Sequence, residues 1–117
     1  MGSAINLAEK LTRFSDHWSP KIVGTFNGHD LMVVKVKGEF VWHSHDDTDD
    51  FFQVLKGAIR IEMKDGNVDL NEGEIFVVPR GVEHRPVADE EAHLLIIEPA
   101  GTPNTGDAAT AVEKIEI

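Results

Sequence analysis

Cysteine is absent from this chain of 117 residues, which excludes disulfide scaffolds, thiolate zinc sites and cysteine nucleophiles. The absence also fits a reducing compartment. No apolar run approaches the roughly 20 residues that a membrane span needs, and the N-terminus has no basic segment followed by a long apolar one. The sequence therefore predicts a cytoplasmic protein that does not partner a membrane.

Basic residues are scarce, since 11 lysines and arginines stand against 21 aspartates and glutamates and give a formal net charge of −10. Nucleic acids and anionic membranes are bound by basic surfaces. The charge balance therefore argues against both as main partners. The length suits one domain with one hydrophobic core.

Short strands dominate the middle of the chain. Residues 4–14 have the apolar spacing of a short helix that packs across a barrel end, with Ser3 as a candidate N-cap and Ser19-Pro20 as its stop. Beyond it, turn residues separate apolar or alternating segments. The expected strands are 21–26, 31–37, 39–45, 51–55, 58–63, 68–70, 74–78, 83–88 and 93–98. Close spacing of this kind is typical of an all-β sandwich or barrel.

Three regions follow from this pattern. We expect a helix and lead-in over 1–20, a β-barrel over 21–99 and a C-terminal tail over 100–117. The stretch GTPNTGDAATA is small and polar, which favours a loose tail. Residues 112–117 are alternatively an edge strand.

Two histidines, His43 and His45, are separated by one residue. If residues 39–45 form a strand, both side chains point to the same face, with Cα atoms about 6.6 Å apart. That separation lets two imidazoles converge on one metal ion. Two exposed histidines on an edge strand fit the pair equally well.

A carboxylate follows the histidine pair at the start of an apolar segment. Asp50 would share a face with Phe52 and Val54, where an acid needs a cation or a hydrogen-bond donor. Asp49 is the alternative if the strand starts earlier. In a second hairpin, His84 follows a turn and would face inward. The pattern favours a metal site of His43, His45, Asp50 and His84.

These residues resemble the two motifs of the cupin family. The first motif reads Gly38, four residues, His43-Ser44-His45, four residues, Asp50, six residues and Gly57; the second reads Gly73, five residues, Pro79-Arg80-Gly81, two residues, His84, three residues and Ala88. The first glycine lies one residue closer to His43 than is usual in the family. Asp50 stands in place of the usual glutamate, and Ala88 in place of a frequent asparagine.

The resemblance implies a small jelly-roll barrel with a divalent transition metal inside, open at one end, and often a homodimer. Donors of this kind suit Fe, Mn, Ni, Co, Cu or Zn. Cupins include metal-dependent oxygenases, non-redox isomerases, epimerases or lyases of sugars and organic acids, and ligand-binding modules without turnover. Since fold does not choose among these, we give first place to an oxygenase-type enzyme that acts on a small organic molecule.

A proton-transfer enzyme also needs a titratable group besides the metal ligands. The candidates are Glu39, which is in phase with His43, and His93 and Glu98 of the last expected strand. A surface or rim position is the alternative for each.

Other residues bear on the ligand. An apolar lining of Phe52, Val54 and Ile61 would suit an aromatic or aliphatic molecule better than a sugar, and Arg80 or Arg85 can meet an anionic substrate at the mouth. Trp42 is expected to pack away from the metal.

Overall fold

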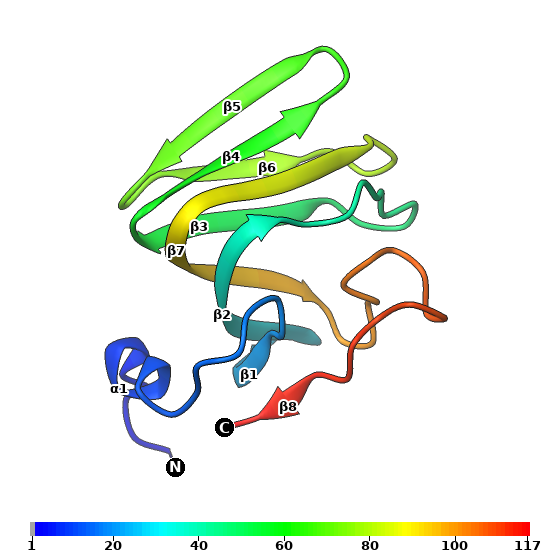
Figure 1. Cartoon of the computed structure of the whole chain (residues 1–117). Helices are drawn as coiled ribbons and strands as arrows, with labels where there is room; N and C mark the ends of the chain where they lie inside the picture. The colour runs from blue at the N-terminus through cyan, green and yellow to red at the C-terminus, as the bar shows by residue number, and fades with distance from the viewer. Residues whose placement is uncertain (1) are drawn as a thin grey trace.

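The computed structural model describes residues 2–117, and in this part of the chain it shows one short helix and eight strands (Figure 1). The elements are α1 (Leu7–Leu11), β1 (Lys21–Phe26), β2 (His29–Glu39), β3 (Asp50–Lys56), β4 (Ala58–Met63), β5 (Gly66–Asn71), β6 (Ile75–Val78), β7 (His84–Pro99) and β8 (Ile115–Glu116). The expectation of an all-β fold with a short N-terminal helix is confirmed.

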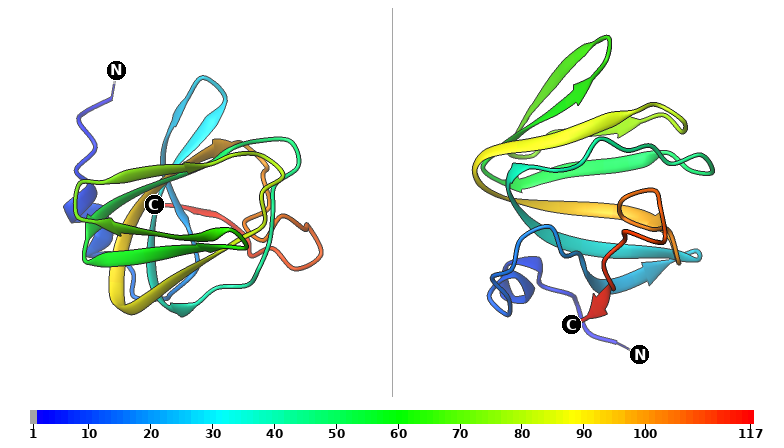
Figure 2. Two further views of the ribbon diagram at one scale, coloured as in Figure 1. Left: turned by 90° about the horizontal axis from the view of Figure 1, so that it is seen from above. Right: turned by 45° about the vertical axis from the view of Figure 1, so that its right-hand side comes forward.

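One long strand, β7, joins the two parts of the sheet. Hydrogen-bonded neighbours run in the order β5-β4-β7-β2-β1-β8, and β3 pairs with both β7 and β6. The first residues of β7 pair with β4 and its later residues with β3, while β2 pairs along both halves. Figure 1 shows β7 curving back on itself between these two groups of strands, and Figure 2 shows the barrel from two further sides.

The largest differences from the sequence prediction concern two pairs of expected strands. β2 continues through Gly38 to Glu39, because Gly38 adopts a φ of 80° and the register with β7 shifts there instead of breaking. The separate strand expected over 39–45 is therefore wrong, and only an isolated bridge between His43 and His84 remains in that segment. The strands expected over 83–88 and 93–98 are one strand, since both halves pair with β2.

The core lies between the facing strands. Alternate residues of each strand point inward, so that Met32, Val34 and Val36 of β2 face inward together with members of β3, β4 and β7. The remaining buried members of this core are Phe52, Val54, Ile59, Ile61, Leu70, Val78, Ala88, Ala92, Leu94 and Ile96. The predicted phase of β3 is confirmed, because Asp50, Phe52 and Val54 are buried while their neighbours are less so.

The N-terminal helix is shorter than expected. Its N-cap is Asn6, whose side chain accepts a hydrogen bond from the Glu9 amide, and not Ser3. It ends before Phe14, whose carbonyl oxygen accepts a hydrogen bond from Lys35 Nζ at 2.6 Å. The helix lies beside β2, as expected for packing against the barrel. None of the helices in residues 2–117 is long and apolar enough to cross a membrane.

The last segment of the chain, residues 100–117, lies against the barrel. Of the two alternatives for its end, the structure shows the edge strand, because β8 pairs with β1 in parallel and the Ile117 amide donates to the Ile22 carbonyl at 3.0 Å. Lys10 Nζ of the helix donates to the Ile117 carbonyl at 2.9 Å. Both ends of the chain are thus attached to the same side of the sheet (Figure 1).

Candidate metal centre and adjoining cavity

Two loops bring the predicted metal ligands together. His43 and His45 lie in the loop after β2, Asp50 begins β3 and His84 begins β7. The loops are held to each other by backbone hydrogen bonds between His43 and His84, at 3.0 and 2.9 Å, and by a third from the Gly81 amide to the His45 carbonyl at 2.8 Å. These bonds place both histidines on the inner side even though the strand expected there is absent.

The four side chains form one compact buried cluster. Each of His43, His45, Asp50 and His84 offers a ligand atom, and these atoms all lie within 4.8 Å of one another. Asp50 Oδ2 is 2.8 Å from His84 Nε2, 3.3 Å from His45 Nε2 and 3.9 Å from His43 Nε2. The alternative acid, Asp49, is exposed and accepts a hydrogen bond from the Arg80 amide instead.

Backbone carbonyls orient two of the imidazoles. His43 Nδ1 lies 2.9 Å from the Val41 carbonyl and His84 Nδ1 lies 2.9 Å from the Val82 carbonyl. A carbonyl only accepts hydrogen bonds, so both Nδ1 atoms carry a proton, and both Nε2 atoms face the cluster, where each would supply a lone pair to a bound metal. Metal-binding histidines are usually fixed by such contacts. They were not identifiable from the sequence, because they are made to the backbone.

The cluster fits a metal ion in chemistry and in size. His45 Nε2 is buried without a hydrogen-bond partner among the residues that the structure describes, and such an atom is costly unless something binds it. Two ligand atoms about 2.1 Å from one ion and at a right angle lie about 3.0 Å apart. The contacts of Asp50 with His84 and His45 are close to that value. The donor set is compatible with several divalent transition metals.

Burial and mutual contact set the charges of the cluster. Burial lowers the pKa of His43 to about 4, so that this imidazole is neutral and free to bind a cation. Burial would raise the pKa of Asp50, but the contacts with His45 and His84 outweigh it and hold the pKa at about 2. Burial alone would lower the pKa of His45, but the contact with Asp50 outweighs burial, and the pKa is raised above its ordinary value. An ionised carboxylate among imidazoles is a suitable cation site.

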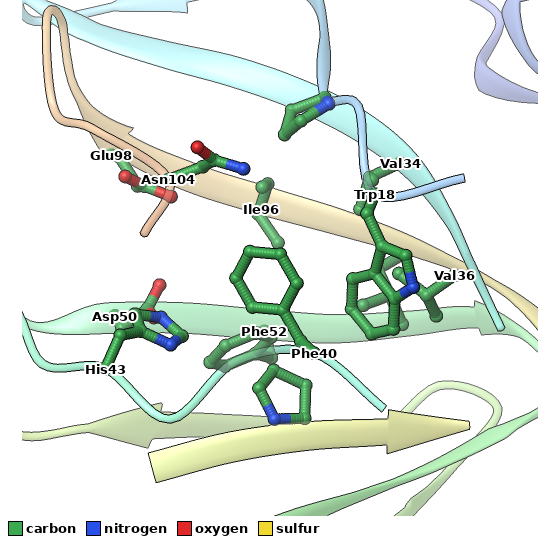
Figure 3. A pocket seen from close by; sticks show the side chains of 13 residues that line it. Trp18, Val34, Val36, Phe40, His43, Asp50, Phe52, Ile96, Glu98 and Asn104 are labelled. Carbon is green, nitrogen blue, oxygen red and sulfur yellow. The ribbon is translucent and has the colours of Figure 1, made fainter. Parts of the chain in front are cut away.

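A cavity opens beside this cluster (Figure 3). The cavity volume open to the centre of a water molecule is about 50 Å³. One water molecule needs roughly 10–15 Å³ of such volume, so the cavity has room for several waters or for a molecule with a single small ring. Figure 3 shows the polar side chains gathered toward one end and aromatic ones toward the other. The lining residues are Trp18, Pro20, Val34, Val36, Phe40, His43, Asp50, Phe52, Pro86, Leu94, Ile96, Glu98 and Asn104.

The aromatic wall was largely missed by sequence reasoning. Phe52 lines the cavity as expected, but Val54 and Ile61 belong to the core and not to the lining. Trp18 stacks on Phe40 with ring centroids 4.8 Å apart, and its indole N–H donates to the Lys37 carbonyl at 2.9 Å.

Trp42 lies outside the cavity, as expected. Its ring is partly exposed, and Lys64 Nζ lies 4.1 Å from the ring centroid. Its position therefore agrees with the expected packing away from the histidine cluster.

Of the three candidate proton-transfer residues, only Glu98 lines the cavity. It is 3% exposed, and burial raises its pKa to about 7, with the charge of Asp50 adding to the effect. Glu39 is exposed and accepts a hydrogen bond from Arg85, and His93 contacts Glu91 at 3.1 Å.

Neither arginine candidate reaches the cavity lining. Arg85 donates hydrogen bonds to Glu62 and Glu39, and Arg80 is exposed with its Nε 3.7 Å from Asp49. The expectation that one of them meets an anionic substrate at the mouth finds no contact to support it.

The C-terminal segment supplies a residue that sequence reasoning did not consider. Asn104 is 9% exposed and lines the cavity. The segment is held in place at Gly106, where an added Cβ would meet the Ser44 carbonyl oxygen between the two histidines. Lys114 adds a hydrogen bond to the Thr102 carbonyl. The histidine loop and the C-terminal segment are therefore packed against each other.

This packing can be tested at Gly106. We expect Gly106→Ala to lower the free energy of unfolding by more than the roughly 1–2 kcal/mol that a left-handed residue costs, since φ is 75° and the new Cβ has no room. Gly101→Ala is the matched control, because φ is 85° there but nothing lies within 4 Å of the added atom. Urea denaturation measures both, and equal losses would contradict the contact.

The chain belongs to the cupin domain family, whose sequence profile matches residues 30–98, more than half of the chain. A cupin-2 domain containing protein from Shewanella frigidimarina is 47% identical, with a TM-score of 0.80 over 81% of this chain and 93% of that one. The predicted family and the jelly-roll barrel are thereby confirmed.

Curated relatives include a dioxygenase. The 3-hydroxyanthranilate 3,4-dioxygenase of Brucella anthropi is 33% identical over 92 residues, which cover 71% of this chain and 50% of that enzyme. YdbB of Bacillus subtilis is 33% identical over 87 residues, covering 65% of this chain and 77% of that protein. The chain thus spans about half the length of the curated dioxygenases it matches.

Proposed function

We propose that this cupin is a metal-dependent enzyme of the oxygenase type that acts on a small aromatic molecule, with His43, His45, Asp50 and His84 as the metal ligands. The strongest support for the proposal is that the buried cluster and the cavity lie next to each other. A buried cluster of three imidazoles and one carboxylate adjoins a cavity whose far wall is aromatic. The similarity to 3-hydroxyanthranilate 3,4-dioxygenase agrees with this chemistry.

The protein's own residues would bind and orient the substrate. Four protein ligands leave one or two positions on a five- or six-coordinate ion, and a bound metal would supply Lewis-acid or redox chemistry there. Trp18, Phe40 and Phe52 would hold a ring by stacking and edge contacts. The apolar wall also excludes water from the space beside the ion.

Oxygen consumption tests this proposal. Protein loaded with Fe(II) under anaerobic conditions is mixed with air-saturated buffer and a panel of phenols, including 3-hydroxyanthranilate, and of diketones. We expect oxygen uptake with at least one phenol, its loss in His84→Ala, and its retention in His29→Ala. His29 is a suitable control because its ring forms a hydrogen bond with the Asn27 carbonyl and lies outside the cluster. A loaded wild type that consumes no oxygen with any compound overturns the proposal.

A non-redox isomerase or lyase is the second candidate, and one observation favours it. Glu98 is a buried carboxyl group beside the cluster, and burial raises its pKa to about 7, close to the value that suits a general base. Conversion of a uronic acid or an organic acid without oxygen uptake, abolished in Glu98→Gln, would support this candidate instead. The homodimer implied by the family resemblance stays a prediction, which light scattering can test.

A further inference from the structure

Glu98 and Asn104 are two polar side chains in a cavity that is otherwise apolar apart from the metal cluster. Glu98 is 3% exposed and Asn104 is 9% exposed. Placing polar groups in such surroundings costs free energy unless each finds a hydrogen-bond partner. An atom of either side chain that has no partner in the protein is available to a ligand.

Glu98 keeps an unused acceptor. Its Oε2 atom is buried and has no hydrogen-bond partner among the described residues. The nearest cation, Lys114 Nζ, lies 3.7 Å away, which is too long for a hydrogen bond, and it donates to the Thr102 carbonyl instead. Lys114 therefore balances charge, while the acceptor capacity of the carboxyl group remains available.

Asn104 keeps an unused donor. Its Oδ1 atom accepts a hydrogen bond from the Val112 amide at 3.0 Å. The Val112 amide N–H needs an acceptor, so the side-chain oxygen of Asn104 must face Val112. The Nδ2 atom of the carboxamide therefore points the other way. In Figure 3 this nitrogen is directed into the cavity, toward Ile96. No residue that the structure describes accepts a hydrogen bond from it.

We propose that Glu98 and Asn104 together form a subsite that binds the hydroxyl group of a small phenol. A hydroxyl group donates one hydrogen bond and accepts another, so it satisfies the Glu98 carboxyl oxygen and the Asn104 amide nitrogen at once. The ring then occupies the aromatic end of the cavity between Phe40, Phe52 and Trp18. This proposal rests on the proposed function, which supplies the aromatic ring of the substrate. It adds the hydroxyl group as the substituent that the protein recognises on that ring.

The segment that carries Asn104 lies beyond the part of the chain that the cupin profile matches. The cupin profile matches residues 30–98, so Glu98 is its last residue and Asn104 lies beyond it. Asn104 would act as a specificity-determining residue, since it contacts the substrate and not the metal. A site built to hydrogen-bond a hydroxyl group rejects an analogue that lacks it, because its buried polar atoms are then left unpaired.

Fluorine NMR titrations with 4-fluorophenol and 4-fluorotoluene test the subsite, because a methyl group replaces the hydroxyl at similar size. The protein is loaded with zinc, which has no redox chemistry. We expect wild-type protein to prefer the phenol. The preference is measured as the Kd for 4-fluorotoluene divided by the Kd for 4-fluorophenol. Glu98→Gln should reduce this ratio by roughly tenfold, and Asn104→Asp by at least about threefold, as expected for the loss of a charged and of a neutral hydrogen bond.

Asn104→Asp is chosen because it keeps an oxygen for the Val112 amide while removing the donor. Thr105→Val is the matched control, since Thr105 bonds only within its own segment, to Thr110 and Asp107, and does not line the cavity. This variant should keep the wild-type preference. A wild type that binds both compounds equally or neither, or folded variants at both positions with unchanged preference, overturns the proposal.

Failure of the subsite and failure of the proposed function give different results. The titration needs neither oxygen nor turnover, so absence of oxygen uptake counts against the oxygenase alone. Absence of discrimination between the two fluorinated compounds counts against the subsite alone.

Discussion

Replacing His84 with alanine should lower the affinity for a divalent transition metal by more than about 100-fold, since loss of a mere supporting contact around a metal ligand already costs 10–100-fold. His84 is 1% exposed and its Nε2 atom lies 2.8 Å from Asp50, so its loss removes one imidazole from the buried interior of the cluster. His43→Ala should have a similar effect. Asp50→Ala should also lower affinity, by less if the shorter aspartate side chain binds through water.

Elemental analysis of protein purified without added metal, followed by calorimetric titration with zinc, measures these effects. His29→Ala should bind metal as the wild type does. Thermal unfolding gives an independent readout, because a ligand at 100 times its Kd stabilises the folded state by about 2.7 kcal/mol. A wild type without bound metal, or a His84→Ala variant that binds as tightly as wild type, would contradict the assignment of these residues as ligands.

Glu98→Gln should make the metal-free protein progressively more stable than wild type as pH rises. The pKa of Glu98 is raised by burial from 4.5 in the unfolded chain to about 7 in the folded one. Between these values the folded wild type holds a proton that the unfolded chain has lost, so wild-type stability falls as pH increases. The relative gain of the variant from about pH 4 to about pH 8 should approach 3 kcal/mol.

Urea denaturation in the presence of a chelator, at several pH values, checks this expectation. The difference between variant and wild type isolates Glu98, because groups that titrate in both proteins cancel. Glu90→Gln supplies the baseline for removing a carboxylate at an exposed position of β7. A difference that stays flat across the range would contradict the raised pKa of Glu98.

The sequence could predict the metal cluster because its members obey short-range rules. The spacing of His43 and His45, the turn before His84 and the apolar phase of β3 each depend on a few neighbouring residues. The sequence predicts a strand over 39–45, but residues 40–45 follow an irregular path, which explains why Phe40 faces the cavity together with His43. An alternation rule places those two residues on opposite faces.

The rest of the site depends on contacts between distant segments. Trp18 reaches the cavity only because its backbone adopts a φ of 59° and its ring stacks on Phe40. Asn104 lies in a stretch whose small, polar composition favours a loose tail. The pairing of β8 with β1 and the packing of Gly106 on Ser44 help to hold that stretch against the barrel. Neither effect has a local sequence signal.

Because the C-terminal segment is attached to the barrel, the residues proposed to bind the metal and a residue proposed to bind the substrate lie in different parts of the chain. All four proposed cation ligands lie between the end of β2 and the start of β7, whereas Asn104 of the cavity lining comes from the residues after β7. If Asn104 binds the substrate as proposed, a substitution at this one position would change which molecule is accepted without removing a metal ligand. On that proposal, ligand preference and metal binding depend on different parts of the chain, so the first could change through residues after β7 while the second is kept by the barrel.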